Sequence, residues 1–254
     1  MSVDERMVHD IVQKVMANMQ ISGSVSGMHG VFKDMNDAIN ASIEAQKKVC
    51  TMTLDQREQI ISLIRKKTHE NAEILANMGV NETGMGNVGD KILKHHLTAD
   101  KVPGTEDIST IAWSGDRGLT LVEMGPFGVI GAITPATNPS ETVICNCIGM
   151  LAGGNTVVFN PHPNAKKTTI YTINMINEAS IEAGGPDNIA VTVEAPTLDT
   201  SAIMMKHPSI HLLVATGGPG VVTAVLSSGK RAIGAGAGNP PVLVDETADI
   251  RKAD

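Results

Sequence analysis

The sequence is poor in aromatic residues, cysteines and long apolar runs. Aromatic side chains are only 2% of the 254 residues, so a core must be built from aliphatic side chains, alanine and methionine. No apolar run approaches the roughly 18 residues of a membrane span, and charges stand where a signal peptide would be apolar. Three cysteines, an odd number, make no disulfide framework and fit a reducing compartment. These absences predict a soluble, cytoplasmic protein without a membrane partner.

Dense basic clusters and metal-ligand spacings are also lacking. The formal net charge is -7, which argues against a nucleic-acid partner. His95 and His96 are adjacent, so on a helix their side chains point in different directions. We therefore expect no metal site and interpret both as solvated helix residues. A hydrophobic fraction of 42% is enough for one large or two modest domains.

The N-terminal residues differ in pattern from the rest of the chain. Residues 1–20 predict an amphipathic helix, because apolar residues recur at helical spacing at Val8, Ile11, Val12, Val15, Met16 and Met19. Residues 21–30 are rich in glycine and serine, as in a flexible linker. Two interpretations stay open. The helix folds back on its own domain, or it docks its apolar face in a groove of another protein.

Helices and then an extended segment are expected after the linker. The pattern is helical to about Met78, and Thr53 to Gln56 has the spacing of a capping box. Residues 81–91, with three glycines, interrupt it. The segment near 118–128 indicates extended chain.

From residue 128 on, short apolar runs alternate with helical patterns. The runs predict strands at 128–134, 155–160, 188–193, 210–216 and 240–246. The segments 140–151, 166–183 and 220–228 suit helices. This alternation predicts an α/β fold with a doubly wound, mainly parallel, Rossmann-like sheet within residues 31–254.

Ligands in such sheets bind outside the carboxyl ends of the strands. Several of the predicted strand ends run into polar, glycine-rich or proline-rich segments. The candidate cofactor-binding residues are therefore Thr134, Pro135, Ala136, Thr137, Asn138, Asn160, His162, Thr216, Gly217, Gly218, Pro219, Gly220, Gly236, Ala237 and Gly238.

Two of these segments have a plainer alternative. Gly217 and Gly218 let a backbone approach a ligand, and a helix starting at Pro219 would direct its N–H groups at phosphate oxygens. The same residues also make a good strand-to-helix turn. Asn138 can likewise cap the next helix through its side chain instead of contacting a ligand.

The order of these motifs closely resembles the aldehyde dehydrogenase superfamily, and within it the CoA-acylating branch. The motifs that carry the resemblance are GVIGAITPATNPSET, NTVVFNPHPNA, ATGGPGVV, SSGKRAIGAGAGNPPVLVDETADI and the early ETGMG. The resemblance implies an aldehyde dehydrogenase-like fold with NAD as cofactor and CoA as co-substrate. It also implies a small aldehyde such as acetaldehyde or propionaldehyde as substrate, and a homo-oligomer at full length. It implies that the Asn138 side chain is a hydrogen-bond donor of the oxyanion hole. A fixed N–H group there stabilises the negative charge that develops on the substrate oxygen.

Two departures from the superfamily pattern indicate the acylating branch. Hydrolytic members have a motif similar to Glu-Leu-Gly-Gly-Lys where this chain has Ala-Gly-Ala-Gly-Asn at 235–239. The carboxylate that activates water in those members is therefore missing here. A thiol could then resolve the acyl-enzyme. The usual lysine-proline pair is replaced by Asn160 and Pro161, followed by His162. His162 either steers a phosphate or is a polar loop residue.

The resemblance places the nucleophilic cysteine downstream of Asp254, outside this chain. Cys145 and Cys147 follow Asn138 where relatives carry no catalytic thiol, and we interpret both, with Cys50, as packing residues. The chain is then expected to be the NAD-binding part of a truncated enzyme, inactive alone and without the catalytic domain. A non-catalytic nucleotide-binding or scaffold subunit and a phosphorylated-semialdehyde reductase are the alternatives. Residues 1–20 also resemble the peptides of microcompartment enzymes, which implies a shell protein as partner and a location inside a bacterial microcompartment.

Overall fold

A six-stranded parallel sheet forms the centre of the protein. The structure is a computed structural model that describes residues 27–239 and 241–253. The strands lie in the order β1-β6-β5-β4-β7-β8, and every pair of neighbours is parallel. Their bounds are β1 (Val31–Phe32), β4 (Val129–Thr134), β5 (Thr156–Pro161), β6 (Ala190–Val193), β7 (Ile210–Thr216) and β8 (Arg231–Ala235). The predicted α/β fold with a mainly parallel sheet is confirmed.

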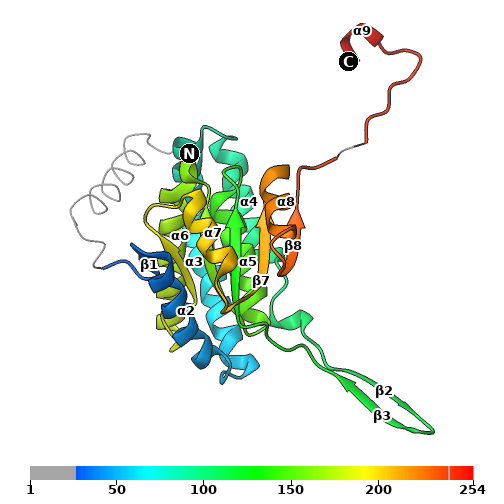
Figure 1. Cartoon of the computed structure of the whole chain (residues 1–254). Coiled ribbons are helices and arrows are strands. Elements are labelled where there is room, and N and C mark those ends of the chain that lie inside the picture. Colours follow the sequence, from blue (N-terminus) through cyan, green and yellow to red (C-terminus); the bar gives the residue numbers. More distant parts are fainter. Residues whose placement is uncertain (1–26, 240, 254) are drawn as a thin grey trace.

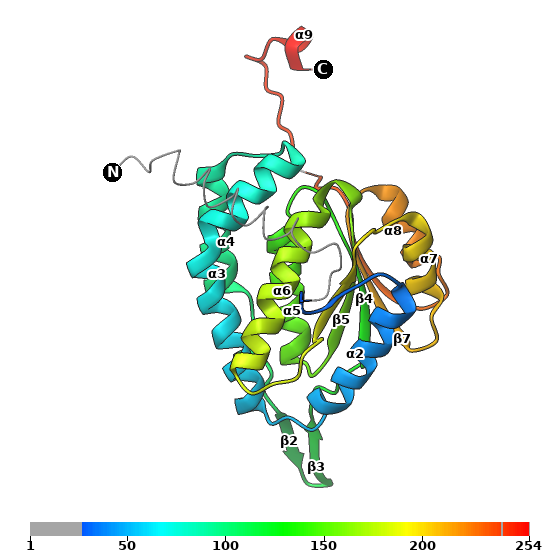
Figure 2. The same cartoon turned by 90° about the vertical axis from the view of Figure 1, so that its left-hand side faces the viewer.

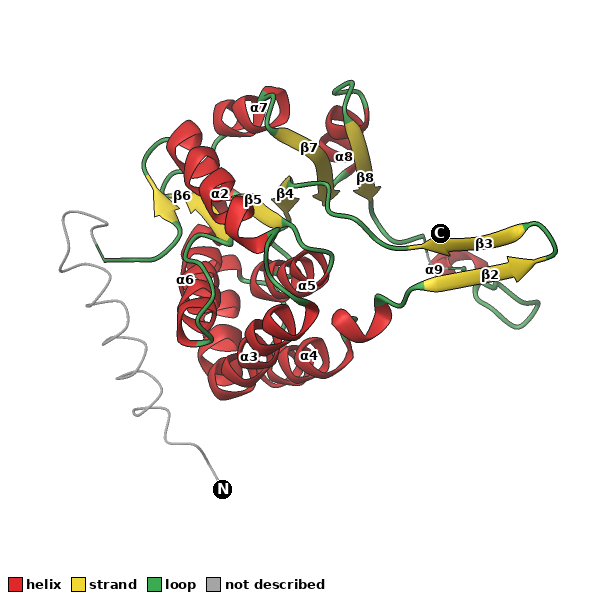
Figure 3. Ribbon diagram, turned by 90° about the horizontal axis from the view of Figure 1, so that it is seen from below, coloured by secondary structure: helices red, strands yellow, loops and turns green. Residues whose placement is uncertain are grey.

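Helices cover both faces of this sheet (Figures 1 and 3). One face carries α5 (Pro139–Ala152) and α6 (Lys166–Glu182), and the other carries α2 (Met35–Val49), α7 (Leu198–Lys206) and α8 (Pro219–Leu226). A further layer of α3 (Leu54–Thr83) and α4 (Val88–Lys101) packs on α5 and α6, as Figure 2 shows. The short helices η1 (Thr105–Asp107), η2 (Pro163–Ala165) and α9 (Ile250–Ala253) complete the described helical elements.

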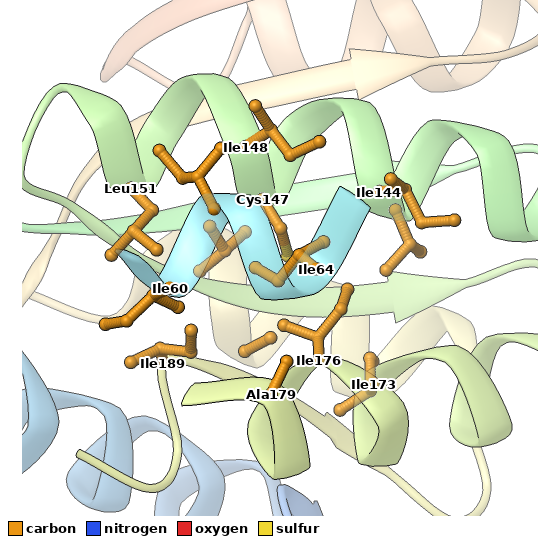
Figure 4. Packing of buried hydrophobic residues seen from close by; sticks show 14 of the residues in the cluster. Ile60, Ile64, Ile144, Cys147, Ile148, Leu151, Ile173, Ile176, Ala179 and Ile189 are labelled. Carbon is orange, nitrogen blue, oxygen red and sulfur yellow. The ribbon is translucent and has the colours of Figure 1, made fainter. Parts of the chain in front are cut away.

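The core is aliphatic, as the low aromatic content requires. Its larger cluster lies between α3, α5 and α6 and the adjacent sheet face, where isoleucines such as Ile60, Ile144 and Ile173 are fully buried (Figure 4). Each such side chain contributes about 1.5–3 kcal/mol on burial. A second cluster fills the space between the sheet and α2, α7 and α8. Cores on both faces hold the strands in one register, which fixes where their carboxyl ends lie.

The helix signals at the start and end of α3 are present in the structure. Thr53 and Gln56 form the predicted capping box, with N–H to side-chain oxygen distances of 3.2 and 2.9 Å. The helix continues past Met78 to Thr83 and ends at Gly84, whose φ of 68° is left-handed. Glycine is the residue that adopts this conformation without steric cost.

A hairpin of β2 (Ile111–Gly115) and β3 (Gly118–Val122) extends from the body, with its residues exposed (Figure 1). The extended segment predicted near 118–128 covers β3 but misses β2. The strand predicted at 240–246 is wrong for the described residues 241–246, which form no strand and expose Val242 and Leu243. The strand beside β7 is instead β8, which lies earlier in the chain at Arg231–Ala235 and was not predicted.

The N-terminal helix predicted for 1–20, and linker residues 21–26, lie outside the described residues. Linker residues 27–30 lie against the body. The His29 backbone N–H donates to Asn174 at 2.9 Å, and the His29 ring is 2.8 Å from Asp187. Gly30 is buried, and a Cβ there would lie 2.4 Å from the Ala190 carbonyl oxygen. The chain is therefore fixed to the body at this point.

Candidate functional site

The topology of the sheet places a switch point at β4. From β4 the chain adds β5 and β6 on one side, then crosses to add β7 and β8 on the other. In register, Thr134 pairs with Pro161 and Thr216 pairs with Ala235. Four strand ends therefore lie in a row at the edge toward which the arrows point in Figure 1. Open α/β sheets bind ligands in the crevice beside such a switch point.

A cleft of about 910 Å³ lies at this edge. The sequence-predicted residues meet there, because all of them except Pro219 and Gly220 line the cleft. Those two are the first residues of α8, immediately behind the cleft. Three of the segments that meet follow strands that were predicted, and the fourth, Gly236 to Gly238, follows β8, which was not predicted. They are separated by up to about a hundred residues in the chain.

Two features of the cleft wall fit a bound ligand. The Thr134 side chain is only 2% exposed, yet its hydroxyl has no hydrogen-bond partner in the described part of the chain. Buried hydroxyls are nearly always paired, so this one fits a ligand atom. A Cβ at Gly217 or Gly218 would meet no atom within 4 Å, so glycine leaves the backbone open to the cleft.

The start of α8 is suited to an anion. Gly218 is its N-cap residue and supplies no side-chain cap, and Pro219 occupies the first turn. The first N–H groups of a helix have no acceptor within the helix, and the helix dipole is positive there. Pro219 has no N–H, and the Val221 N–H donates to the Gly218 carbonyl at 3.1 Å. Among the described residues, the Gly218 and Gly220 N–H groups are therefore the donors that this end of α8 offers to a phosphate group.

Asn138 begins α5 and lines the cleft. It occupies the N-cap position, but its side chain makes no capping hydrogen bond, so the alternative of a side-chain cap is wrong. Its Oδ1 instead accepts from the ammonium groups of Lys91 at 3.3 Å and Lys94 at 3.2 Å. An ammonium can only donate, which assigns the oxygen to that side of the amide and the NH₂ group to the other.

The interpretation of His95 as a solvated residue is wrong. His95 is fully buried between α4 and α5, with Nδ1 2.7 Å from the Lys91 carbonyl oxygen and Nε2 2.7 Å from Ser140 Oγ. Desolvation lowers the pKa of His95, partly opposed by the charge of Glu141. Neighbouring helical residues point in different directions, so only His96 faces outward, where its ring stacks on His69.

Asn160 and His162 differ in what they offer a ligand. The Asn160 side chain is buried, and its amide bonds to α7: Oδ1 accepts from Thr200 Oγ1 at 2.6 Å, and Nδ2 donates to the Thr197 carbonyl at 3.3 Å. Its amide therefore holds α7 in place. His162 is exposed, and its Nδ1 accepts from the Asn164 N–H at 3.2 Å, which leaves Nε2 for other contacts. Among the described residues that line the cleft, His162 is the titratable one.

Sequence reasoning missed the side of the cleft formed by α7. Thr197, Leu198 and Ser201 line it. The available signal was a capping arrangement, in which Thr197 and Thr200 exchange backbone-to-hydroxyl hydrogen bonds of 2.8 and 3.1 Å. A Thr-x-x-Thr sequence is a weaker marker than the usual Thr-x-x-Glu, so the helix was not predicted.

None of the three cysteines lines the cleft, and all lie in the described part of the chain. Cys147 is buried in the core (Figure 4), and burial raises its pKa. Burial also raises the pKa of the half-buried Cys145. Both thiols are therefore protonated near neutral pH and poor nucleophiles. Cys50 was expected to be a packing residue, but it is exposed, because it caps the C-terminus of α2 at the surface.

The described residues contain no helix long and apolar enough to cross a bilayer. They also contain no group of three or more histidine, cysteine or acidic side chains arranged to hold a metal ion.

The similarity of the sequence to known proteins agrees with this geometry. A profile of the aldehyde dehydrogenase family matches residues 17–253. The chain belongs to the aldehyde dehydrogenase family. An acetylating acetaldehyde dehydrogenase of Bilophila wadsworthia is 47% identical over 259 residues, which cover 98% of this chain and 53% of that protein. This family member is similar in sequence to enzymes that are CoA-acylating aldehyde dehydrogenases.

Solved structures of the family superpose well on this chain. A propionaldehyde dehydrogenase from the Clostridium phytofermentans fucose utilisation bacterial microcompartment is 75% identical, with a TM-score of 0.83 over 89% of this chain and 52% of that one. A Rhodopseudomonas palustris propionaldehyde dehydrogenase with bound propionyl-CoA is 49% identical, with a TM-score of 0.83 over 92% of this chain and 53% of that one. The chain thus spans about half the length of these family members.

Proposed function

We propose that residues 31–254 are the NAD(H)- and CoA-binding part of a CoA-acylating aldehyde dehydrogenase. The observation that carries this proposal is the convergence of the predicted strand ends on one cleft at the switch point of the sheet. The partnerless Thr134 hydroxyl and the open backbone at Gly217 and Gly218 support a ligand in that cleft. The first turn of α8 would hold the diphosphate of the dinucleotide.

CoA uses the same cleft in this proposal. Like NAD, it carries an adenosine and a diphosphate, so it can use the same backbone donors. The R. palustris relative was solved with propionyl-CoA bound, which supports the choice of ligand. No lysine or arginine is among the described residues that line the cleft, so His162 is the side chain placed to meet the additional phosphate of CoA.

The complete reaction converts an aldehyde, CoA and NAD⁺ into an acyl-CoA, NADH and a proton. NAD⁺, when bound, accepts the hydride from the aldehyde carbon. Asn138 Nδ2 donates to the substrate oxygen when a thiolate adds to the carbonyl and charge develops on that oxygen. Because the chain's own cysteines lie away from the cleft, that thiolate comes from outside these 254 residues, and the chain alone does not turn over aldehyde.

The remaining expectations concern partners. We propose that residues 1–20 form a docking helix for a shell protein or another enzyme and that residues 21–30 connect it to the body. The microcompartment source of the C. phytofermentans relative supports this location. We propose a small aldehyde such as acetaldehyde or propionaldehyde as the substrate, because the relatives include an acetaldehyde dehydrogenase and a propionaldehyde dehydrogenase. The longer protein is expected to be a homo-oligomer in the cytoplasm, inside such a compartment.

Titration of the chain with NADH, followed by fluorescence, tests the proposed function. Gly218→Val is the informative variant, because φ of -68° and ψ of 161° suit any residue and its side chain would enter the open cleft. It should weaken NADH binding about tenfold or more, which is about 1.4 kcal/mol, without changing the melting temperature. Gly115→Val is the matched control, since its Cβ also meets open space but lies on the hairpin.

Competition with CoA completes this test. If the two ligands share the cleft, added CoA should raise the apparent dissociation constant for NADH, and Gly218→Val should weaken both ligands. Independent, noncompeting sites would contradict the shared cleft. Absence of NADH binding to the folded chain, or equal binding to the Gly218 variant, would contradict the proposed function itself.

A further inference from the structure

The side-chain amide of Asn138 has two chemically opposite ends. Its oxygen only accepts hydrogen bonds and its nitrogen only donates them. A rotation of 180° about the last side-chain bond exchanges the two ends at almost the same shape. As an oxyanion donor, Asn138 works only with the nitrogen toward the substrate, because the oxygen would repel the developing negative charge. Something must therefore select one orientation.

Two ammonium groups meet the Asn138 oxygen from α4. Lys91 Nζ lies 3.3 Å and Lys94 Nζ lies 3.2 Å from Oδ1. The two lysines are three residues apart, so they project from one side of the helix. No described residue accepts a hydrogen bond from Nδ2 of Asn138. The donors thus act on one end of the amide only, and the other end is free at the cleft.

Lys91 is itself held in place by its surroundings. Its side chain is 5% exposed, and its Nζ donates to the Thr137 carbonyl at 2.6 Å and to Glu141 Oε1 at 3.0 Å. Ser140 Oγ lies 3.2 Å from the other Glu141 oxygen and 2.7 Å from Nε2 of the buried His95. This buried network joins α4 to the first turn of α5, which begins directly after Asn138. The ammonium of Lys91 therefore has little freedom to leave Oδ1.

We propose that Lys91 and Lys94 are positioning residues that fix the Asn138 amide with its NH₂ group toward the cleft. The proposal rests on the proposed function, in which Asn138 is the oxyanion donor. The lysines do two things in it. They exclude the flipped amide, which would bring an NH₂ group against two cations, and they polarise the amide so that its N–H becomes a stronger donor. Neither lysine touches the substrate.

The side-chain amide signals of Asn138 in ¹⁵N NMR spectra of the chain test the proposal. The signals are assigned by their loss in Asn138→Asp. In the unaltered chain they should have the order parameter of a rigid group, roughly 0.85, and in Lys94→Met, which leaves Lys91 as the remaining donor, the value should be measurably lower. Lys94→Arg, which retains a donor, should restore it. Lys101→Met is the matched control, because it removes an exposed lysine from the end of the same helix.

Lys91 needs a second variant, because removing it alone leaves the buried Glu141 without its cation. Lys91→Met combined with Glu141→Gln removes both charges, and it should lower the Asn138 order parameter in the folded protein as Lys94→Met does. An amide that stays rigid in both Lys94→Met and this double variant would overturn the proposal. Equal loss of order in Lys101→Met would overturn it too, since the effect would not be specific.

The measurement separates this proposal from the proposed function. NADH binding is measured separately in the unaltered chain, where in the proposed function it depends on the backbone at α8 and not on the orientation of the Asn138 amide. A folded chain that shows the expected amide response but binds no NADH would contradict the proposed function and support the positioning role of Lys91 and Lys94. NADH binding with an unresponsive amide would contradict only the positioning role.

Discussion

The ion pair between Lys91 and Glu141 predicts a large, non-additive effect of mutation on stability. The two side chains are only 5% and 7% exposed, and their Nζ–Oε1 distance is 3.0 Å. Lys91→Met leaves the Glu141 carboxylate in a site where water cannot solvate it. Breaking a buried pair in this way costs about 3–5 kcal/mol. At about 2–4 °C per kcal/mol for a chain of this size, the melting temperature should fall by about 6–20 °C.

The double variant Lys91→Met/Glu141→Gln should recover much of this loss. It has no buried charge, and replacing both members of a buried pair is often nearly neutral. The assay is urea unfolding of the original chain, both single variants and the double variant, followed by circular dichroism. The coupling between the two sites should be at least about 2 kcal/mol. Additive losses, or a Lys91→Met variant within about 0.5 kcal/mol of the original, would refute the reasoning that the pair is buried and mutually dependent.

Three further predictions concern the rest of the fold. A Cβ at Gly131 would lie 3.0–3.2 Å from three core side chains, so Gly131→Val should lower the unfolding free energy by about 1–3 kcal/mol. Gly149→Ala in the exposed part of α5 should raise the unfolding free energy by about 0.5–1 kcal/mol. Equal effects of Gly131→Val and Gly149→Ala in urea unfolding would contradict the packing of β4. Because burial lowers the pKa of His95, the unfolded state binds a proton that the folded state does not. The contribution of His95 to the unfolding free energy should therefore be fully present above about pH 6.5. It should fall as the pH drops toward the pKa of His95 in the folded state, by at most about 1.4 kcal/mol per pH unit. A His95→Asn variant with the same pH dependence would contradict this assignment. A disulfide reagent should modify the exposed Cys50 in the folded chain well before Cys147, as mass spectrometry of the labelled peptides would show; labelling of Cys147 at the same rate would mean that α5 is not packed as described.

The position of the candidate site could be predicted because it depends on a general property of parallel sheets. Strand ends with unusual composition, such as Thr134 to Asn138 and Thr216 to Gly218, must lie at one edge once the strands are parallel. Nothing about the individual side chains was needed for that step. Four strands, β4 to β7, were recognisable because buried parallel strands are continuous apolar runs. The mostly exposed β8 and the two-residue β1 gave no such signal and were not predicted.

The network around Asn138 could not be predicted from the sequence in the same way. Lys91 contacts Thr137 across 46 positions of the chain, and a polar helix such as α4 gives no sign that one of its charged residues is buried. His95 was misinterpreted for the same reason, since its burial depends on how α4 packs on α5. Burial of polar residues is decided by their partners, and those partners come from other elements.

The strand predicted at 240–246 shows the opposite error. Its apolar run has the composition of a buried strand, yet Leu243 is 93% exposed in this chain. An apolar run indicates that a segment can be buried, but only a neighbouring element can bury it.

A crystal structure of the chain grown with NADH would test the central claim most directly, namely that the strand ends form a dinucleotide site. The account predicts the diphosphate within hydrogen-bond distance of the N–H groups that open α8, and a ligand atom within reach of the Thr134 hydroxyl. NADH bound at another face, or a cleft that stays empty at a saturating concentration, would contradict it.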